Sequence, residues 1–457
     1  MLRKIIRGIF LGALALLAIL AGWLYLAPPE LLRVGTSYSA KIVCSNRFIA
    51  NRDPAEVLAV DVQAPGHPLL HFISVVVNEQ DKSVTAHIFG FFARAQSVYR
   101  DGLGCTNLPQ GYDRNALAGL PQGPAPLPRP GIMPWPDGDA PLAEADALPG
   151  IKAALADPAL TGPGMRAVVV IRDGKLVGET YGDGFTRETP LLGWSMTKSV
   201  NAAIAGRLMA EGRLSFNDTN LLPEWAGDDR SKIRLGDLMG MESGLRFNED
   251  YGDVSDVTRM LYLEPDMAGF VAGQPLDAAP GTVFTYSTGT SVLISRIWMN
   301  RIADFGEATA YPQKALFAPL GMASAVFETD VTGTLAGGSY LYATARDWAR
   351  FGQFLLQDGV WNGQRLLPEA FMKAARTASK ASGGLYTQAQ TWLAGPDDKP
   401  SAAFDLPEDT IWMQGHDGQT VAIVPSERLV VVRMGLTPRK LGYLPQPLLR
   451  AIIASLK

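Results

Sequence analysis

The chain has 457 residues, of which 47% are hydrophobic, and it contains 47 Gly and 32 Pro. This composition is typical of a loop-rich globular protein with room for two or three domains. Lys and Arg number 41 against 45 Asp and Glu, a net charge of -4, and no basic run occurs beyond the extreme N-terminus. These charges argue against a nucleic-acid-binding protein.

A long apolar segment opens the chain. Three basic residues within the first seven positions precede about twenty mostly apolar residues, which end at Pro28-Pro29 and are long enough to cross a bilayer. Because basic flanks stay in the cytoplasm, the remaining chain would be exported. We therefore expect residues 1–28 to be a single-pass anchor in a bacterial inner membrane, with the rest periplasmic. A cleaved signal peptide, which would release the protein into the periplasm, and a buried helix are the alternatives.

Residues 29–120 are expected to form a small β-containing region. Phe72–Val77 and Ser83–Gly90 are β-rich runs separated by a polar turn. The region also holds the two cysteines of the chain, Cys44 and Cys105, and an oxidising compartment favours a disulfide between them. Closing a loop of about sixty residues would contribute roughly 4 kcal/mol in the chain-entropy model. Two buried free thiols are the alternative.

A proline-rich segment, residues 121–149, holds nine prolines and predicts a stiff linker or a strap on the next domain. The main domain, residues 150–457, opens with a predicted hairpin over 165–181, which turns at Asp173-Gly174. A second hairpin is predicted over 420–434. Helical patterns lie between the hairpins, at 195–211, 234–240, 289–302 and 345–357, and an amphipathic stretch at 444–456 follows them. The pattern predicts an α+β domain, an antiparallel sheet beside a helical lobe.

Ser195-Met196-Thr197-Lys198 opens the first of these helices. Residues three apart on a helix share a face, so the Lys198 amine can reach the Ser195 hydroxyl. A desolvated lysine has a lowered pKa and can activate a serine as a nucleophile. Taken alone, the motif is equally consistent with a serine that caps a helix.

A histidine-based triad is a competing mechanism for Ser195, since Gly193 to Thr197 nearly matches Gly-x-Ser-x-Gly. The chain has four histidines, and His416 is the one in the main domain. No parallel β/α alternation surrounds it, so the lysine mechanism is favoured. No group of His, Cys and carboxylate residues has the spacing of metal ligands, and we expect neither a metal nor another cofactor.

Two later segments complete the candidate site. Tyr286-Ser287-Thr288 comes before a helix, and a phenol near a lysine amine can relay protons. Gly415-His416-Asp417-Gly418-Gln419 precedes an apolar strand, whose edge could offer an N–H group to an oxyanion. A tyrosine in a turn and a simple hairpin turn are the alternative interpretations of these segments.

In this order and spacing, the three elements resemble the serine β-lactamase-like family over roughly residues 150–440. The resemblance is greatest to the branch of class C β-lactamases, esterases and 6-aminohexanoate-dimer hydrolases. Leu235–Met239, Ser243–Leu245 and Tyr342–Asp347 also match the family. The resemblance implies an α/β sandwich with an antiparallel sheet and a helical lobe.

The resemblance also implies roles for individual residues. Ser195 would be the acylated nucleophile, Lys198 its base and Tyr286 the proton relay. The backbone N–H groups of Ser195 and Gln419 would form the oxyanion hole. Substrate contacts would come from His416, Gly418, Thr288 and Tyr251, the last by similarity to the 6-aminohexanoate-dimer hydrolases.

Two departures from the family pattern bear on the substrate. The Lys-Thr-Gly triplet of β-lactamases is replaced by His416-Asp417-Gly418, and the Asn of Tyr-x-Asn by Thr288. Both changes weaken the features that bind the carboxylate and amide of a β-lactam. They favour an esterase, amidase or short-oligomer hydrolase acting on a small ester, amide or peptide. A D-Ala-D-Ala carboxypeptidase, a weak β-lactamase and a non-catalytic binding or sensor protein are the alternatives.

Overall fold

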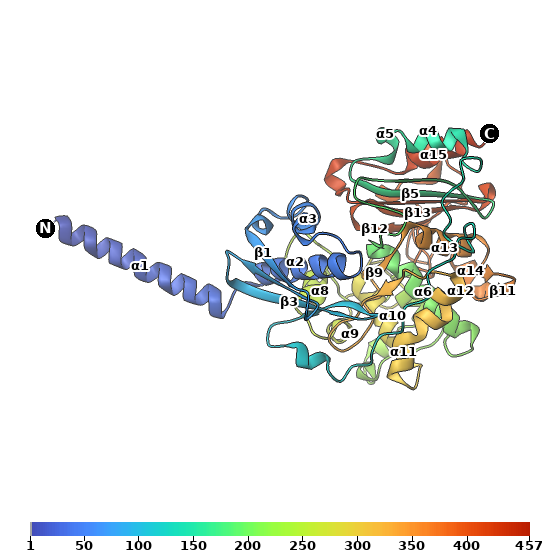
Figure 1. Ribbon diagram of the computed structural model, residues 1–457. Helices are drawn as coiled ribbons and strands as arrows, with labels where there is room; N and C mark the ends of the chain where they lie inside the picture. The colour runs from blue at the N-terminus through green and yellow to red at the C-terminus, as the bar shows by residue number, and fades with distance from the viewer. Residues whose placement is uncertain (1) are drawn as a thin grey trace. The chain divides into compact units, whose positions relative to one another are not determined.

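The computed structural model describes residues 2–457, which group into two compact units (Figure 1). The first unit takes in the chain up to Tyr99 together with Cys105–Ala118 and Asp250–Pro265. The second comprises Arg100–Gly104, Gly119–Glu249 and Asp266–Lys457.

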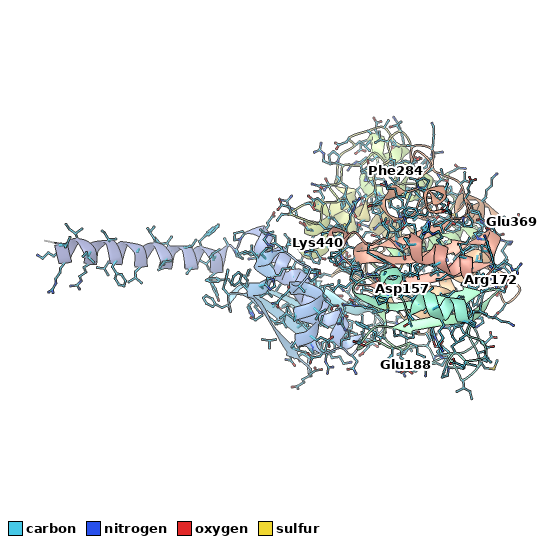
Figure 2. The ribbon with its side chains drawn as sticks, turned by 90° about the horizontal axis from the view of Figure 1, so that it is seen from above. Asp157, Arg172, Glu188, Phe284, Glu369 and Lys440 are labelled. Atoms are coloured by element: carbon cyan, nitrogen blue, oxygen red, sulfur yellow. A yellow bond between two sulfur atoms is a disulfide. The ribbon has the colours of Figure 1, made fainter. Side chains whose placement is uncertain are left out.

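The first unit begins with an apolar helix, α1 (Leu2–Leu26), which has the length and composition of a membrane span. None of its residues is buried, and its side chains project from all sides of the helix (Figure 2). A single N-terminal helix of this kind is shared by membrane anchors and signal sequences. The predicted helix is therefore present.

The rest of the first unit is a helix packed on a four-stranded antiparallel sheet in the order β1-β2-β3-β4. The helix is α2 (Glu30–Phe48), and Cys44 on it forms the predicted disulfide with Cys105 on β4. The sequence predicted β1 and β2 but not α2, because much of its buried face is Ser, Thr and Ala and gives little apolar periodicity. The strands are β1 (Ile73–Asn78), β2 (Ser83–Ile88), β3 (Phe92–Arg100) and β4 (Gly104–Leu108). A short helix, α3 (Pro54–Val57), follows α2 in the sequence.

A segment from the middle of the chain also belongs to the first unit. Its helix α8 (Asp256–Tyr262) packs on α2, where Arg259 forms an ion pair with Glu30 and the Tyr262 ring meets that of Tyr38 edge-on. Domain boundaries drawn from the sequence placed this segment with residues 150–457. Contacts between residues more than 200 positions apart leave no local signal, which explains the difference.

The second unit is built on a five-stranded antiparallel sheet in the order β12-β13-β14-β5-β6. Both predicted hairpins are present, and at the first turn Asp173 and Gly174 have positive φ angles. The apolar C-terminal stretch forms a helix that packs on the sheet, as expected. The strands are β5 (Met165–Arg172), β6 (Lys175–Tyr181), β12 (Ile411–Gly415), β13 (Gln419–Val424) and β14 (Leu429–Gly435).

Helices cover both faces of this sheet (Figure 1). On one face α4 (Pro149–Leu155) and α15 (Gln446–Ser455) bury a continuous apolar layer against the strands, with Ile151, Val170 and Ile452 fully covered. On the other face α13 (Ala345–Leu356) packs on β5, β13 and β14. This is the sandwich that the sequence resemblance implied.

The helical lobe lies beyond α13 in the second unit, with α10 packed against α6, α7 and α9. Its helices are α6 (Thr197–Ala210), α7 (Leu235–Met239), α9 (Met267–Ala272), α10 (Thr288–Asn300), α11 (Phe305–Pro312), α12 (Ala318–Leu320) and α14 (Glu369–Ala374). Short strands accompany them: β7 (Leu191–Leu192), β8 (Val326–Phe327) and β9 (Leu341–Ala343) in one sheet, β10 (Val360–Trp361) and β11 (Gln364–Arg365) in another. The remaining short helix, α5 (Pro158–Thr161), precedes β5.

The proline-rich segment is held on the second unit by α13. Trp135 is buried and donates its indole N–H to the Arg346 carbonyl, and Arg350 donates to the carbonyls of Pro136 and Gly138. Arg350 also forms ion pairs with Asp139 and Asp347. Of the two forms expected, linker or strap, the segment has the contacts of a strap.

Candidate active site

Ser195 lies on a short helical turn, η4 (Trp194–Met196), between β7 and α6. The two residues before Ser195 both constrain this turn. A Cβ on Gly193 would come within 2.2 Å of the Trp348 ring, and Trp194 has a φ of +48°. A non-glycine residue in the left-handed region costs of order 1–3 kcal/mol, and such strain concentrates at functional sites.

Lys198 is one helical turn further on and is completely buried. Its Nζ lies 2.9 Å from Ser195 Oγ, 3.0 Å from Thr288 Oγ1 and 2.8 Å from the Gly338 carbonyl oxygen. Burial lowers the pKa of Lys198 to about 8, although the charge of Glu249 acts in the opposite direction. The amine therefore titrates close to neutral pH.

Glu249 and Thr288 form the outer part of this network. The Thr288 backbone N–H donates to Glu249 Oε2 at 2.8 Å, and the Thr288 hydroxyl donates to Glu249 Oε1. Since its proton is directed at the carboxylate, the hydroxyl presents a lone pair to Lys198 and accepts from it.

These partners determine which way a neutral Lys198 points its lone pair. A neutral amine has two N–H donors and one lone pair, and both the Gly338 carbonyl and the Thr288 hydroxyl act as acceptors. The two N–H groups are therefore used, and the lone pair faces the third neighbour, the Ser195 hydroxyl. This geometry suits a general base for Ser195.

Tyr286 lies over the same amine, with Lys198 Nζ 4.9 Å from the centre of its ring. Burial raises the pKa of the Tyr286 phenol; its hydrogen bond to Ser195 acts the other way, and the charge of Glu249 acts with burial. Trp392 and Tyr386 enclose the ring, with centroids at 5.2 and 5.8 Å. The phenol is thus protonated at neutral pH and can serve as a donor.

The ends of β12 and β13 pack against η4. Gly415 pairs with Gln419 across the two strands, and a Cβ on Gly415 would lie 2.3 Å from the Gly193 carbonyl oxygen. Gln419 is buried, and its side-chain oxygen accepts from the Gly435 N–H at 2.8 Å. The start of β13 is therefore held beside the turn that carries Ser195.

His416 also adjoins this turn. Its ring meets the Trp194 ring edge-on at 5.5 Å, and its side chain is 47% exposed. Gly418 has a φ of +82°, and its carbonyl accepts from Arg433, whose guanidinium fills the space that a side chain at Gly418 would need. His416 is thus about half exposed beside the turn that carries Ser195, whereas Gly418 has a structural reason to be glycine.

The β-lactamase family model matches residues 153–438 of the chain. The chain belongs to the β-lactamase family. A 6-aminohexanoate-dimer hydrolase from Paenarthrobacter ureafaciens is 26% identical over 274 residues, which are 54% of this chain and 69% of that protein.

Solved structures of the β-lactamase fold agree with the architecture. A class C β-lactamase superimposes with a TM-score of 0.52 at 16% identity, over 70% of this chain and 98% of that one. A penicillin-binding protein homologue from Caulobacter crescentus gives 0.52 at 16% identity, over 67% of this chain and 96% of that one. At these identities the likeness concerns the fold.

The sequence-predicted site residues of this β-lactamase-family chain fall into three groups. The structure brings together Ser195, Lys198 and Tyr286, with Thr288 as a hydrogen-bonding partner of the lysine. His416, Gly418 and Gln419 adjoin them at the ends of β12 and β13. Tyr251 lies in the first unit, in the turn before α8, and its substrate contact stays a prediction.

Glu249 is the residue that the sequence reasoning missed. A single carboxylate in a polar loop has no distinguishing pattern in the sequence. The fold brings it to Thr288, which is 39 residues further along the chain. The one signal in the sequence that could have indicated such a carboxylate was Thr288, since a hydroxyl in place of the family's asparagine needs a different hydrogen-bonding partner.

Proposed function

We propose that the protein is a serine hydrolase that cleaves small esters or amides through an acyl-enzyme on Ser195. The observation that carries this proposal is the environment of Lys198. It is buried, its pKa is near 8, and its partners leave the lone pair of the neutral amine to Ser195. A serine that merely capped a helix would need no such partner.

Acylation begins when Ser195 Oγ attacks the substrate carbonyl carbon and its proton passes to Lys198 Nζ. The negative charge that develops on the carbonyl oxygen is stabilised by the N–H groups of Ser195 and Gln419. As the intermediate collapses, Tyr286 donates its phenolic proton to the leaving alcohol or amine. The Lys198 ammonium then returns a proton to Tyr286, so that both groups regain their starting states.

Deacylation uses water as the nucleophile. Water attacks the acyl carbonyl and gives a proton to Lys198, and the Ser195 oxygen leaves with that proton. The acid product is released, and the amine is neutral again. Glu249 takes no proton in either half-reaction; by holding the Thr288 hydroxyl, it keeps the lysine in the orientation of a base.

The replacements at His416 and Thr288 support an ester or a linear amide as substrate. At the position of the β-lactamase lysine stands a half-exposed imidazole, and at that of the asparagine a hydroxyl engaged by Glu249. Neither group is arranged to hold the carboxylate and amide of a β-lactam. The similarity to a 6-aminohexanoate-dimer hydrolase points the same way.

A fluorophosphonate probe tests the proposal. Wild-type protein should be labelled on Ser195, and Ser195→Ala should lose the label and all turnover of p-nitrophenyl esters. Ser199→Ala is the matched control, because this serine lies on α6 directly after Lys198 and donates to the Gln390 carbonyl. Wild-type protein that takes up no label and turns over no ester would favour the binding or sensor protein.

The substrate alternatives are separated by a panel of esters, linear amides, D-Ala-D-Ala peptides and nitrocefin. Turnover of esters or linear amides without nitrocefin supports the proposal. Preferential release of D-alanine would identify a carboxypeptidase, and fast nitrocefin turnover a β-lactamase.

We further propose that α1 stays attached and anchors the protein in the inner membrane, with both units periplasmic. The helix has no charged residue from Gly8 to Leu26, and the disulfide suits an oxidising compartment. Membrane fractions should contain the full-length chain, and protease should reach it only after the outer membrane is opened. A shortened chain in the soluble periplasmic fraction would identify a signal peptide instead.

A further inference from the structure

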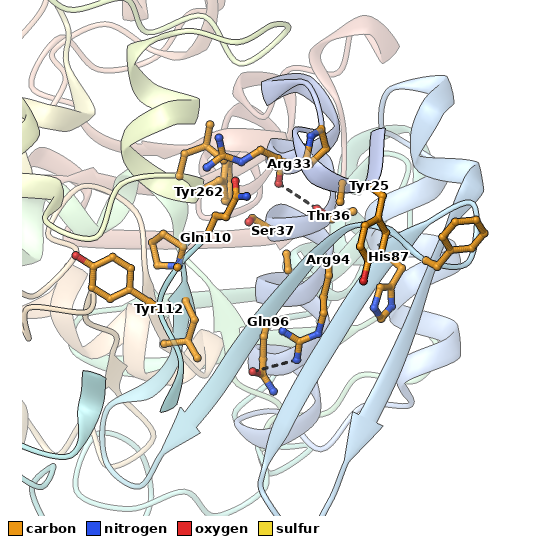
Figure 3. A pocket seen from close by; sticks show the side chains of 18 residues that line it. Tyr25, Arg33, Thr36, Ser37, His87, Arg94, Gln96, Gln110, Tyr112 and Tyr262 are labelled. Carbon is orange, nitrogen blue, oxygen red and sulfur yellow. Dashed lines mark hydrogen bonds between the residues drawn. The ribbon is translucent and has the colours of Figure 1, made fainter. Parts of the chain in front are cut away.

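A cavity of about 480 Å³ lies in the first unit, among α2, β2, β3 and the segment after β4 (Figure 3). Polar side chains from several elements line it, including Arg33, Ser37, Arg94 and Gln110. The residues that line it also include Tyr25 and Pro28, at the end of α1. The proposed hydrolase makes no use of this cavity.

The charge of the lining is entirely basic. Arg33, His87 and Arg94 contribute nitrogen donors, and the lining contains no Asp or Glu. Within residues 2–457, neither arginine forms an ion pair, and the closest partner of the Arg94 guanidinium is the Gln96 amide at 3.5 Å. Unpaired arginines in a cavity are suited to a multiply charged oxyanion such as phosphate.

The nearest carboxylate of α2 does not neutralise these cations. Glu30 is one turn before Arg33, but both N–H groups of the Arg259 guanidinium that face it bond to its Oε2, at 2.8 and 3.0 Å. The acidic residue at the start of α2 is therefore already paired with an arginine that does not line the cavity.

The position of the cavity along the chain places it at the surface of a bilayer. Arg3, Lys4 and Arg7 occupy one end of α1, and Trp23 and Tyr25 occupy the other, which is the arrangement of a span whose aromatic end meets the interface outside the cytoplasm. Tyr25 itself lines the cavity. A spanning α1 would therefore hold the cavity at the level of the lipid headgroups.

A turn with exposed aromatic side chains adjoins the cavity. Phe91, which lines the cavity, is 58% exposed, and Phe89 in the same turn is 47% exposed and lies against Phe72. Large apolar side chains at the rim of a basic site give it both a polar interior and a lipid-compatible edge.

We propose that this cavity binds the phosphate headgroup of an anionic membrane phospholipid. Arg33 and Arg94 would donate to the phosphate oxygens, with the Ser37 hydroxyl and the Gln110 amide as further donors, while the acyl chains lie along α1 and the exposed phenylalanines. The proposal rests on α1 remaining attached, and it is independent of the hydrolase activity.

Native mass spectrometry of the full-length protein in detergent tests this, with phosphatidylglycerol and phosphatidylcholine titrated separately. Wild-type protein should retain phosphatidylglycerol in preference to phosphatidylcholine. Loss of two charge-assisted contacts in Arg33→Gln/Arg94→Gln should weaken phosphatidylglycerol retention by about tenfold or more. Arg33→Lys/Arg94→Lys, which keeps the charge, should retain part of the binding.

Arg47→Gln/Arg114→Gln is the matched control, because both arginines are in the first unit and outside the cavity, paired with Glu79 and Asp81. It removes the same charge and should bind like wild type. Circular dichroism and resistance of the first unit to protease should show that all variants are folded.

Equal retention of the two lipids by wild type, or equal loss in the control variant, would overturn the proposal. So would undiminished retention in Arg33→Gln/Arg94→Gln. Calorimetry of lipid-free protein with glycerol 3-phosphate and inorganic phosphate distinguishes the source of the ligand. Binding of the free anions as tight as that of phosphatidylglycerol would assign the cavity to a soluble phosphate instead.

Discussion

At the scale of single residues, the proposed chemistry depends on where three protons reside. Lys198 must be neutral to accept the Ser195 proton, Tyr286 must be protonated to donate, and the Thr288 hydroxyl must point at Glu249. Burial favours the first two, because it lowers the pKa of the lysine and raises that of the phenol. The Glu249 carboxylate orients the Thr288 hydroxyl by accepting its hydrogen bond.

The titration of Lys198 predicts the pH dependence of acylation. With a pKa of about 8, the base is mostly protonated at neutral pH and becomes neutral as the pH rises through that value. The rate of Ser195 labelling and kcat/KM for an ester should therefore climb through about pH 8 and then level off. A rate that falls across this range would exclude Lys198 as the base.

Glu249→Gln gives a more discriminating prediction, since the charge of Glu249 raises the pKa of Lys198. Removing it should move the rising limb of the profile to lower pH. The plateau should fall by about tenfold or more, because the Thr288 hydroxyl is no longer held in place. A purely structural role would lower the plateau without moving the limb.

The control for this charge change is Glu224→Gln, on the surface of the second unit, where Glu224 pairs with Arg296 at 3.5 Å. Its pH profile should coincide with that of wild type. A limb that moves equally in both variants would show a general effect of net charge, and the assignment of Glu249 as a positioning residue would fail.

At the scale of elements, local patterns predicted those parts of the fold that depend on neighbouring residues. Asp173-Gly174 between two apolar runs predicted the β5–β6 hairpin, and the helical pattern over 195–211 predicted α6 to within about two residues at each end. The contact between Ser195 and Lys198 could be predicted from the sequence because a single helical turn brings the two side chains together.

Elements that depend on distant partners were not predictable in the same way. The buried face of α2 includes Ser39, Ala40 and Ser45, which carry no apolar signal until the sheet and the disulfide are in place. Glu249 likewise could not be predicted as a site residue, because its contact with Thr288 forms only in the folded chain. In both cases the prediction required knowledge of tertiary contacts, which local secondary-structure propensity does not contain.

The proline-rich strap illustrates an element stabilised by buried charge. Arg350 on α13 is completely buried and bonds to Asp139 on the strap at 2.8 Å and to Asp347 at 2.7 Å. Arg350→Ala would remove the buried guanidinium from both carboxylates and should cost about 3–5 kcal/mol.

Thermal unfolding of the second unit, followed by loss of Ser195 labelling, measures this cost as a lowered midpoint. Arg365→Ala is the control, because its ion pair with Asp358 is 38–40% exposed and should contribute at most about 1 kcal/mol. A midpoint that moves no more for Arg350 than for Arg365 would mean that the strap is not held by these charges.

At the scale of the whole molecule, the residues on which the two proposals rest lie in different units. Ser195, Lys198, Glu249 and Thr288 all belong to the second unit, while α1, the disulfide and the basic cavity belong to the first. The chain enters the Asp250–Pro265 segment of the first unit directly after Glu249. The proposed catalytic residues and the proposed membrane-binding features therefore belong to different units, although Glu249 and the first-unit segment Asp250–Pro265 are adjacent in the sequence.

The disulfide offers a test of this division. It closes a loop of 61 residues in the first unit, so replacing both cysteines should destabilise that unit by roughly 4 kcal/mol in the chain-entropy model. In Cys44→Ser/Cys105→Ser, the first unit should become sensitive to protease at lower temperature, whereas Ser195 labelling should persist because its partners lie in the second unit. Wild-type protein treated with reductant should behave in the same way. If labelling and protease resistance were instead lost together, at one temperature, the two units would unfold as a single cooperative body, and catalysis would depend on the disulfide.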